Sequence, residues 1–208
     1  MKKRISNAVI RRLPKYHRYL DNLYKQGITR ISSHMLAENM GLTASQIRQD
    51  LNCFGGFGQQ GYGYNVSSLH NEIAEILGLK TVRKAILLGA GNLGRALIRN
   101  FNFSSCGFDV IAAFDVSESV GSQINNIPVY HIDAVEEFIE REQPYLAILT
   151  LPTNIAQETA FMLEKCGIRG IWNFTNFDLS TARSDVQIEN VHFGDSLMTL
   201  SYKLRDSE

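Results

Sequence analysis

The segment Gly89-Ala90-Gly91-Asn92-Leu93-Gly94 constrains the fold of this chain more than any other. It follows an apolar run at residues 85–88, which predicts a buried parallel strand, and precedes a helical stretch at residues 95–100. A G-x-G-x-x-G pattern between a strand and a helix is typical of dinucleotide-binding folds. The first glycine allows a tight turn, the second lets a pyrophosphate approach the backbone, and the third lets the helix pack on the strand. We therefore expect all six residues to contact a dinucleotide at the helix N-terminus.

A second strand is predicted at residues 110–114 and ends at Asp115, 21 residues after Gly94. A carboxylate at about this distance binds the ribose hydroxyls and repels a 2′-phosphate, which favours NAD(H) over NADP(H). Asp115 and the adjacent Val116 are therefore expected cofactor contacts. The alternative is that Asp115 only caps a turn.

Strand and helix patterns continue to alternate towards the C-terminus. We expect strands at residues 128–130, 146–149, 171–172 and 191–193, and helices at residues 134–142 and 153–166. The alternation predicts an α/β fold with a parallel sheet and right-handed crossovers. Because ligands bind at the carboxyl ends of such strands, the nicotinamide half of the cofactor is expected near a second set of residues. These are Thr150, Pro152, Asn173, Phe174 and Thr175.

Charge divides the chain into two unlike parts, although 21 basic and 21 acidic residues give a net charge of zero. Residues 1–80 hold 11 Lys and Arg against 5 Asp and Glu, a net charge of +6, and residues 81–208 carry −6. This split indicates a basic module joined to an acidic one. We assign residues 1–80 to one domain, residues 81–193 to the dinucleotide-binding domain, and residues 194–208 to a C-terminal helix.

Two short helices around a glycine turn are predicted in the basic part. The first covers residues 35–40, with Ser32 or Ser33 as its N-cap, and the second covers residues 44–54, after Thr43. This spacing predicts a helix-turn-helix whose second helix enters the DNA major groove, although many other folds contain such a pair. The expected DNA contacts are Ser32, Ser33, Thr43, Ser45, Gln46, Arg48 and Gln49. An earlier helix is predicted to start at Pro14.

Residues 55–64 contain five glycines and three aromatic residues. That composition favours a short twisted hairpin after the second helix, as in the wing of a winged helix, over a flexible linker. Wings contact the DNA backbone or minor groove, so Gln59, Gln60 and Tyr62 are expected DNA contacts.

The remaining signals exclude other classes of protein. The three cysteines, Cys53, Cys106 and Cys166, lack the spacing of a zinc site or a disulfide framework, so no metal is expected. No apolar run is long enough to span a membrane, which together with the free cysteines favours a cytoplasmic protein. The last predicted helix, residues 195–204, places Leu197, Leu200 and Leu204 on one stripe, which either packs on its own domain or on a partner subunit.

Taken in order, these motifs resemble the Rex family of bacterial redox-sensing transcriptional repressors over nearly the whole chain. The resemblance is carried by Arg12-Leu13-Pro14-x-Tyr16, Arg30-Ile31-Ser32-Ser33, Ile47-Arg48-x-Asp50-Leu51, the segment from Phe54-Gly55 to Gly63-Tyr64-Asn65-Val66, residues 89–94, Phe114-Asp115, Ala147-Ile148-Leu149-Thr150 with Pro152, and Asn173-Phe174-Thr175. It implies a winged helix that binds operator DNA, with Arg12 among its contacts, and a Rossmann domain that binds NADH and NAD⁺. It also implies a homodimer that exchanges its C-terminal helices.

The function expected from this resemblance is repression of fermentation and respiration genes when NADH is scarce relative to NAD⁺. The operator should be palindromic because a twofold dimer presents two equivalent recognition helices. Release by NADH is expected because Pro152, Phe174 and Tyr64, placed near the nicotinamide, are largely apolar and suit a neutral ring.

The rival hypothesis is an NAD-dependent dehydrogenase. It is disfavoured because residues 81–208 are too few for a substrate domain as well, and no tyrosine has a lysine four residues later. Of the five histidines only His131 and His192 lie in this part, and neither has an evident acidic partner in sequence. A regulator that senses another nucleotide is the third possibility.

Overall fold

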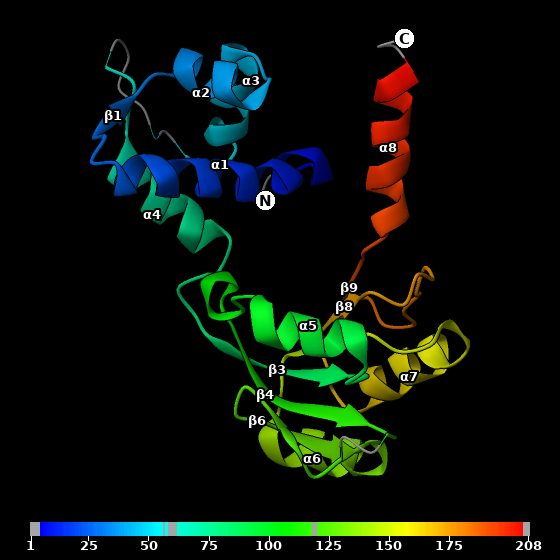
Figure 1. The fold of residues 1–208 in the computed structure, drawn as a ribbon. Helices are drawn as coiled ribbons and strands as arrows, with labels where there is room; N and C mark the ends of the chain where they lie inside the picture. Colours follow the sequence, from blue (N-terminus) through cyan, green and yellow to red (C-terminus); the bar gives the residue numbers. More distant parts are fainter. Residues whose placement is uncertain (1–4, 56, 58–61, 118–119, 206–208) are drawn as a thin grey trace. The chain divides into compact units, whose positions relative to one another are not determined.

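A computed structural model describes residues 5–55, 57, 62–117 and 120–205 of the chain. The chain divides into two compact units, Met1–Thr81 and Val82–Glu208 (Figure 1). Each unit has its own hydrophobic core.

The N-terminal unit begins with the long helix α1 (Asn7–Lys25), capped by the side chain of Ser6. Its buried stripe consists of Val9, Leu13, Tyr16, Leu20 and Leu23. The predicted start at Pro14 is wrong, since Pro14 lies inside the helix. The apolar stripe extends upstream of the proline and Ser6 supplies a cap there, so the helix forms seven residues earlier.

The helix-turn-helix is present as α2 (Ser33–Met40) and α3 (Ala44–Asn52). Ser32 and Thr43 are the two N-caps, and each side-chain oxygen accepts a backbone N–H at 3.1 Å. Helix α3 ends two residues earlier than expected. Its buried residues Ile47 and Leu51 pack with Leu36 of α2 in the core of this unit.

The strand that follows the expected wing pairs with a strand that precedes α2. β2 (Tyr64–Asn65) runs antiparallel to β1 (Arg30–Ile31), and the helix α4 (Val66–Ile76) follows directly, capped by Asn65. The expected wing contacts Gln59 and Gln60 lie outside the described residues.

The C-terminal unit is built on a seven-stranded sheet in the order β5-β6-β4-β3-β7-β8-β9, parallel except for β5. The strands are β3 (Arg83–Leu88), β4 (Phe108–Asp115), β5 (Gln123–Ile124), β6 (Ile127–His131), β7 (Leu146–Leu149), β8 (Gly170–Asn173) and β9 (Gln187–Asn190). The chain winds from β3 outward through β4 and β6, then returns to β7 on the other side of β3. In open α/β sheets, a reversal of this kind marks the place where a ligand is expected, here the carboxyl ends of β3 and β7.

Alternate residues of the strands face two different helical layers (Figure 1). Ile86 and Leu88 pack with α6 (Val135–Glu142) and α7 (Thr153–Lys165), whereas Ala85 and Leu87 pack on the side of α5 (Asn92–Asn100). In residues 174–186, between β8 and β9, the structure has no helix.

That second face carries an apolar groove of about 400 Å³. Its aromatic wall is formed by Phe101, Phe103, Phe108 and Trp172, and Gln187 and Glu189 add polar groups to its lining. The rings of Phe101, Phe103, Trp172, Phe174 and Phe193 follow one another at centroid distances of 4.5 to 6.3 Å.

The last strand differs from its prediction. Residues 191–193 were expected to form it, but β9 is Gln187–Asn190 and Phe193 already begins the final helix. Two other details were not expected. Asp133 lies in a short 3-10 helix (Ile132–Ala134) before α6, and β5 and β6 form a hairpin turned by Asn125 and Asn126.

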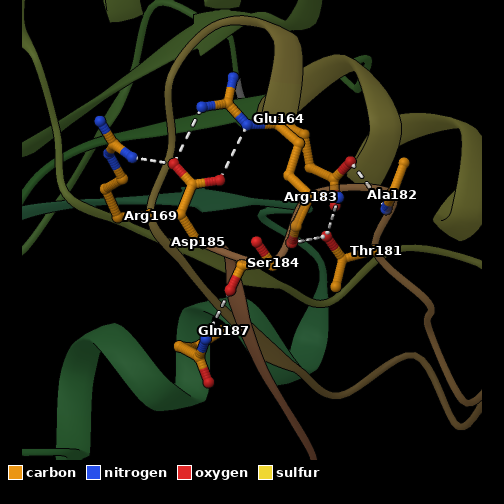
Figure 2. A network of polar contacts seen from close by, with 8 residues as sticks. All are labelled: Glu164, Arg169, Thr181, Ala182, Arg183, Ser184, Asp185 and Gln187. Atoms are coloured by element: carbon orange, nitrogen blue, oxygen red, sulfur yellow. Dashed lines mark hydrogen bonds and ion pairs between the residues drawn. The ribbon is translucent and has the colours of Figure 1, made fainter.

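An ion-pair network closes the loop between β8 and β9 (Figure 2). The Asp185 carboxylate accepts hydrogen bonds from Arg183 at 2.9 and 3.0 Å and also binds Arg169. The bonds from Arg183 lower the pKa of Asp185 to about 2. The buried Glu164 on α7 accepts the backbone N–H of Ala182 and joins the loop to the helix. The network fixes the amino ends of the two strands, opposite the ligand edge.

The final helix, α8 (Phe193–Arg205), has no buried residue. Phe193, Leu197, Leu200 and Leu204 lie on one stripe, and Leu197 is 67 % exposed. An apolar stripe of this size on a free helix requires a covering surface.

Candidate cofactor and DNA-binding sites

The first glycine of the G-x-G-x-x-G segment directly follows β3, next to the carboxyl end of β7. Gly89 has a φ of +100°, and its N–H donates to the Phe114 carbonyl of β4 at 2.8 Å. The Thr150 hydroxyl, directly after β7, donates to the Gly89 carbonyl at 2.6 Å. A Cβ at Gly89 would lie 2.6 Å from the Thr150 carbonyl oxygen. The turn therefore needs glycine, and Thr150 supports it from the neighbouring strand.

The other two glycines differ in the space around them. A Cβ at Gly94 would collide with the Gly89 carbonyl oxygen and lie 2.9 Å from the Thr150 Oγ1, so only glycine lets α5 pack here. At Gly91 a Cβ would meet no atom within 4 Å. The backbone at Gly91 is thus open on the side where a pyrophosphate would approach.

Among the residues that the structure describes, no side-chain hydrogen bond caps the N-terminus of α5. Gly91 is the N-cap and offers no side-chain hydrogen bond to the first turn, which Asn92, Leu93 and Gly94 form. Arg95 donates from Nε to the carbonyl of Ala90 at 2.9 Å and braces the loop. Helix N–H groups left without a side-chain acceptor bind anions, so this end of α5 fits a dinucleotide pyrophosphate.

Asp115 ends β4 next to this turn. Its carboxylate accepts the N–H of Ser117 at 2.7 Å. Burial acts to raise the pKa of Asp115, but hydrogen bonds from Ser117, Val116 and Ala90 outweigh it and hold the pKa below its usual range. Asp115 is therefore an anion suited to accept ribose hydroxyls, and Val116 beside it is exposed.

The expected nicotinamide contacts fall into two groups. Asn173 is 1 % exposed, and its amide donates to the Phe177 carbonyl and the Asn190 side chain while its oxygen accepts from Thr175. The buried side chains of Asn173 and Thr175 thus shape the loop after β8, and their expected contact with the cofactor stays a prediction. Pro152 is exposed and Phe174 half-buried, so these two present apolar surface at the same edge.

Tyr64 does not join this group. Its side chain is buried in the core of the N-terminal unit with Leu36 and Val66. The expectation that Tyr64 contacts the nicotinamide is therefore wrong, because β2 directs its ring into that core.

The helix α3 presents the expected polar face. Thr43, Ser45, Arg48 and Gln49 are exposed, and Gln46 is half-buried. Arg48 donates from Nη1 to the Ser33 hydroxyl at 3.0 Å, which links α3 to the first turn of α2. Ser32 is exposed as the cap of that helix. These groups form a polar surface with one cation in a fixed position.

Arg12 forms an ion pair that the sequence did not predict. Its Nε and Nη2 donate to the two carboxylate oxygens of Asp50 at 2.6 and 2.8 Å, and the Tyr16 hydroxyl donates to Asp50 at 2.6 Å. Asp50 is 3 % exposed. Two of its guanidinium nitrogens thus neutralise a buried carboxylate on α3, while the side chain stays 21 % exposed, and the expected DNA contact of Arg12 stays a prediction. A helical position facing the core, between Ile47 and Leu51, was the signal in the sequence for the role of Asp50.

Comparison with known proteins supports both domains. Residues 4–52 match a family model described as "Putative DNA-binding protein N-terminus", and residues 80–177 match one described as "CoA binding domain". The redox-sensing transcriptional repressor Rex of Thermoanaerobacter pseudethanolicus is 50 % identical over 208 residues, which is 100 % of this chain and 92 % of that protein. The chain belongs to the Rex family.

Other Rex proteins are similar over the same length. Rex of Clostridium botulinum (strain Hall) is 51 % identical over 100 % of this chain and 99 % of its own. The solved structure of the Rex-family repressor RSP with β-NAD⁺ and operator DNA has 50 % identity and a TM-score of 0.92, and covers 99 % of this chain and 94 % of RSP. RSP with β-NADH has 47 % identity and a TM-score of 0.91, with 99 % and 96 % covered.

These relatives are named as transcriptional repressors and not as dehydrogenases. Among the residues that the structure describes, no His, Cys, Asp or Glu group could hold a metal ion. In the same residues, no helix is both long and apolar enough for a bilayer crossing.

Proposed function

We propose that this chain is a redox-sensing repressor that binds palindromic operator DNA and leaves it when NADH binds. Residues 1–80 are the DNA-binding domain, residues 81–193 the NAD(H)-binding domain, and residues 194–208 the dimerisation helix. The observation that carries the proposal is full-length similarity to RSP, which was solved with operator DNA and β-NAD⁺ and with β-NADH. Residues that fit both ligands are present in this chain.

The cofactor is held at the carboxyl edge of the sheet. The N–H groups at the start of α5 bind its pyrophosphate over the open backbone of Gly91, and the Asp115 carboxylate accepts the ribose hydroxyls. Both NAD⁺ and NADH have these groups, so neither contact distinguishes them.

Discrimination rests on the nicotinamide, which is positive in NAD⁺ and neutral in NADH. Pro152 and Phe174 offer apolar surface, and none of the expected nicotinamide contacts is acidic. Because an uncompensated charge is costly to bury, the reduced ring binds more tightly. NADH shifts the protein away from its DNA-binding state only by its differential affinity for the two states.

A homodimer accounts for the two apolar surfaces of the C-terminal unit. The stripe of α8 is exposed, and the groove between Phe101 and Trp172 lies on a sheet face where the β8–β9 connection supplies no helix. The α8 helix of each subunit packs on its partner, and this twofold arrangement presents two α3 helices to the two halves of a palindrome. The dimer works in the cytoplasm, where the DNA and NAD(H) are.

A DNA-shift titration with the RSP operator duplex tests the proposal. NADH should release the duplex at concentrations where NAD⁺ does not. Linkage requires that the duplex weaken NADH binding by the same factor that NADH weakens duplex binding. Equal NADH affinity with and without operator would show that the cofactor site is not the switch.

A further inference from the structure

Arg30 is an exposed cation that sequence reasoning left without a role. It lies on β1, opposite Asn65 of β2, and its backbone is tied to the short sheet of the N-terminal unit. Within the described residues it forms no ion pair. A charge that is held in place and not neutralised inside the unit is available to a ligand.

The Arg30 guanidinium is held by the ring of Tyr62. Its Cζ lies 5.8 Å from the ring centroid, within the range of a cation–π contact. Tyr62 is itself placed by the next residue. A Cβ at Gly63 would lie 2.6 Å from the Ile31 carbonyl oxygen, so glycine lets this segment approach β1 closely and sets Tyr62 beside Arg30.

The two side chains form one wall of a small cleft of about 260 Å³. The rest of its described lining is Phe57, Gly63, Asn65 and Ser68, so no acidic residue among these faces the guanidinium. A cleft with one fixed cation and only neutral neighbours attracts an anion.

The position of Arg30 relative to α2 indicates which anion. Arg30 and the N-cap Ser32 are two residues apart on extended backbone, so their side chains leave the chain on the same side. In a helix-turn-helix, the first helix crosses the DNA backbone, and helix N-termini bind phosphates. The guanidinium therefore lies beside the end of α2 that approaches the phosphate backbone.

We propose that Arg30, held by the Tyr62 ring, binds a backbone phosphate of DNA beside the N-terminus of α2. Tyr62 is then a positioning residue and not a direct DNA contact. The inference rests on the proposed function. It adds a contact that increases affinity for any sequence, because a phosphate carries no base information.

Operator and random duplexes of equal length separate this contact from base recognition. Arg30→Ala should weaken both by a similar factor, about five- to tenfold near 0.1 M salt, and reduce the slope of log affinity against log salt by about 1. Arg30→Lys should keep the wild-type salt dependence and recover part of the affinity, because lysine retains the charge but lacks the planar guanidinium group. Lys80→Ala is the matched loss of one exposed charge in the same unit and should leave the slope unchanged.

A double-mutant cycle tests the role of Tyr62. Tyr62→Phe keeps the ring and should bind both duplexes as wild type does. Tyr62→Leu should lower the affinity for both duplexes almost as much as Arg30→Ala does. The double variant Arg30→Ala/Tyr62→Leu should be no weaker than Arg30→Ala alone, because the two side chains act as one contact. Each variant should also keep the wild-type thermal midpoint, which excludes loss of the fold.

Three results would overturn the inference. The first is that Arg30→Ala lowers the affinity for the operator duplex alone. The second is that the effects of Arg30→Ala and Tyr62→Leu on DNA affinity add up in the double variant. The third is that Arg30→Ala binds both duplexes as tightly as wild type. Each result is compared with a wild-type protein that binds the operator and is released from it by NADH. If wild type itself fails to bind the operator, the proposed function fails instead.

Discussion

The Asp50 carboxylate on α3 is bound by the guanidinium of Arg12 on α1, through two nitrogens at 2.6 and 2.8 Å. The Tyr16 hydroxyl donates a further hydrogen bond to the same carboxylate. The proposed recognition helix α3 is thereby fixed to α1 by an ion pair between residues 38 positions apart in sequence, of which only the Asp50 side chain is buried. The pair therefore fixes α3 against α1.

Removing Arg12 should therefore destabilise the N-terminal unit. Arg12→Met leaves the Asp50 charge buried with one hydroxyl donor, and we expect a loss of about 3 kcal/mol in the free energy of unfolding at pH 7. Lys25→Met, which breaks the exposed pair with Asp21, is the control and should cost less than about 1 kcal/mol. Urea unfolding followed by circular dichroism measures both.

The same ion pair predicts how that loss depends on pH. Burial acts to raise the pKa of Asp50, but hydrogen bonds from Arg12 and Tyr16 outweigh it and hold the pKa below its usual range. The group therefore adds stability above about pH 4, and that stability is lost as the pH falls through the lowered pKa. The difference between wild type and Arg12→Met should shrink on acidification. A constant difference from pH 7 to pH 3 would contradict this account.

Gly91 and Gly94 should respond differently to alanine. Gly94→Ala forces a methyl group into the Gly89 carbonyl, so the ligand-free protein should lose at least about 2 kcal/mol of stability. Gly91→Ala meets open space and should leave the ligand-free protein unchanged while weakening NADH binding at least tenfold. Calorimetric titration and thermal unfolding, applied to both variants, distinguish the two roles. Equal NADH affinity for Gly91→Ala and wild type would remove Gly91 from the pyrophosphate site.

Arg48 should be the main charged contact of the recognition helix. Arg48→Ala should cost about 1–3 kcal/mol of operator affinity if it contacts a base, with less loss on random DNA. Ser33→Ala removes the hydroxyl that positions Arg48 and should cost less, because the guanidinium itself remains. Unchanged operator binding by Arg48→Ala would take this residue off the recognition face.

Two stacked histidines should make the N-terminal unit sensitive to acid. The rings of His17 on α1 and His70 on α4 lie 4.4 Å apart, and His70 also stacks on Tyr24. Burial lowers the pKa of His17, His70 lowers it further, and Asp21 opposes both. The folded unit thus favours neutral His17. Its contribution to stability is present above about pH 6.5 and lost as the pH falls through the lowered pKa.

His17→Phe keeps a ring in this stack but cannot titrate. Its free energy of unfolding should fall less between pH 7 and pH 5 than that of wild type. His34→Gln, which changes an exposed histidine on α2, should follow wild type. Parallel pH profiles for His17→Phe and wild type would show that the stack does not set the acid sensitivity.

The stripe of α8 should hold the dimer together. Deleting residues 195–208 should give monomers or aggregates in light scattering, because the apolar groove then stays uncovered. Leu197→Asp should dissociate the dimer in the intact chain, and Thr199→Asp, on another side of the helix, should not. A well-behaved dimer after the deletion would rule out this role.

Local patterns in the sequence were sufficient for the elements on which both sites are built. The glycine segment between β3 and α5, the caps Ser32 and Thr43, and Asp115 at the end of β4 each depend on neighbours in sequence, so their chemistry is visible there. The position of edge strand β9 was predicted wrongly because three of its four residues are polar, whereas residues 191–193 are more apolar and resemble a strand.

Partners distant in sequence could not be predicted in the same way. Arg12 looks like a free cation until α3 is placed beside it, and Asn173 looks like a ligand contact until Asn190 and Phe177 fill its hydrogen bonds. Both side chains are polar groups whose role depends on burial, which tertiary packing alone decides.

The aromatic residues of the apolar groove also provide an intrinsic fluorescence probe. Trp172 is the single tryptophan of the sequence, and its ring lies 5.3 Å from Phe101 at the groove and 4.5 Å from Phe174 near the cofactor edge. The tryptophan fluorescence of the protein therefore reports on the surroundings of Trp172 alone. A partner subunit that covers the groove would exclude water from the indole and shift its emission to shorter wavelength, so assembly can be followed in solution without a label.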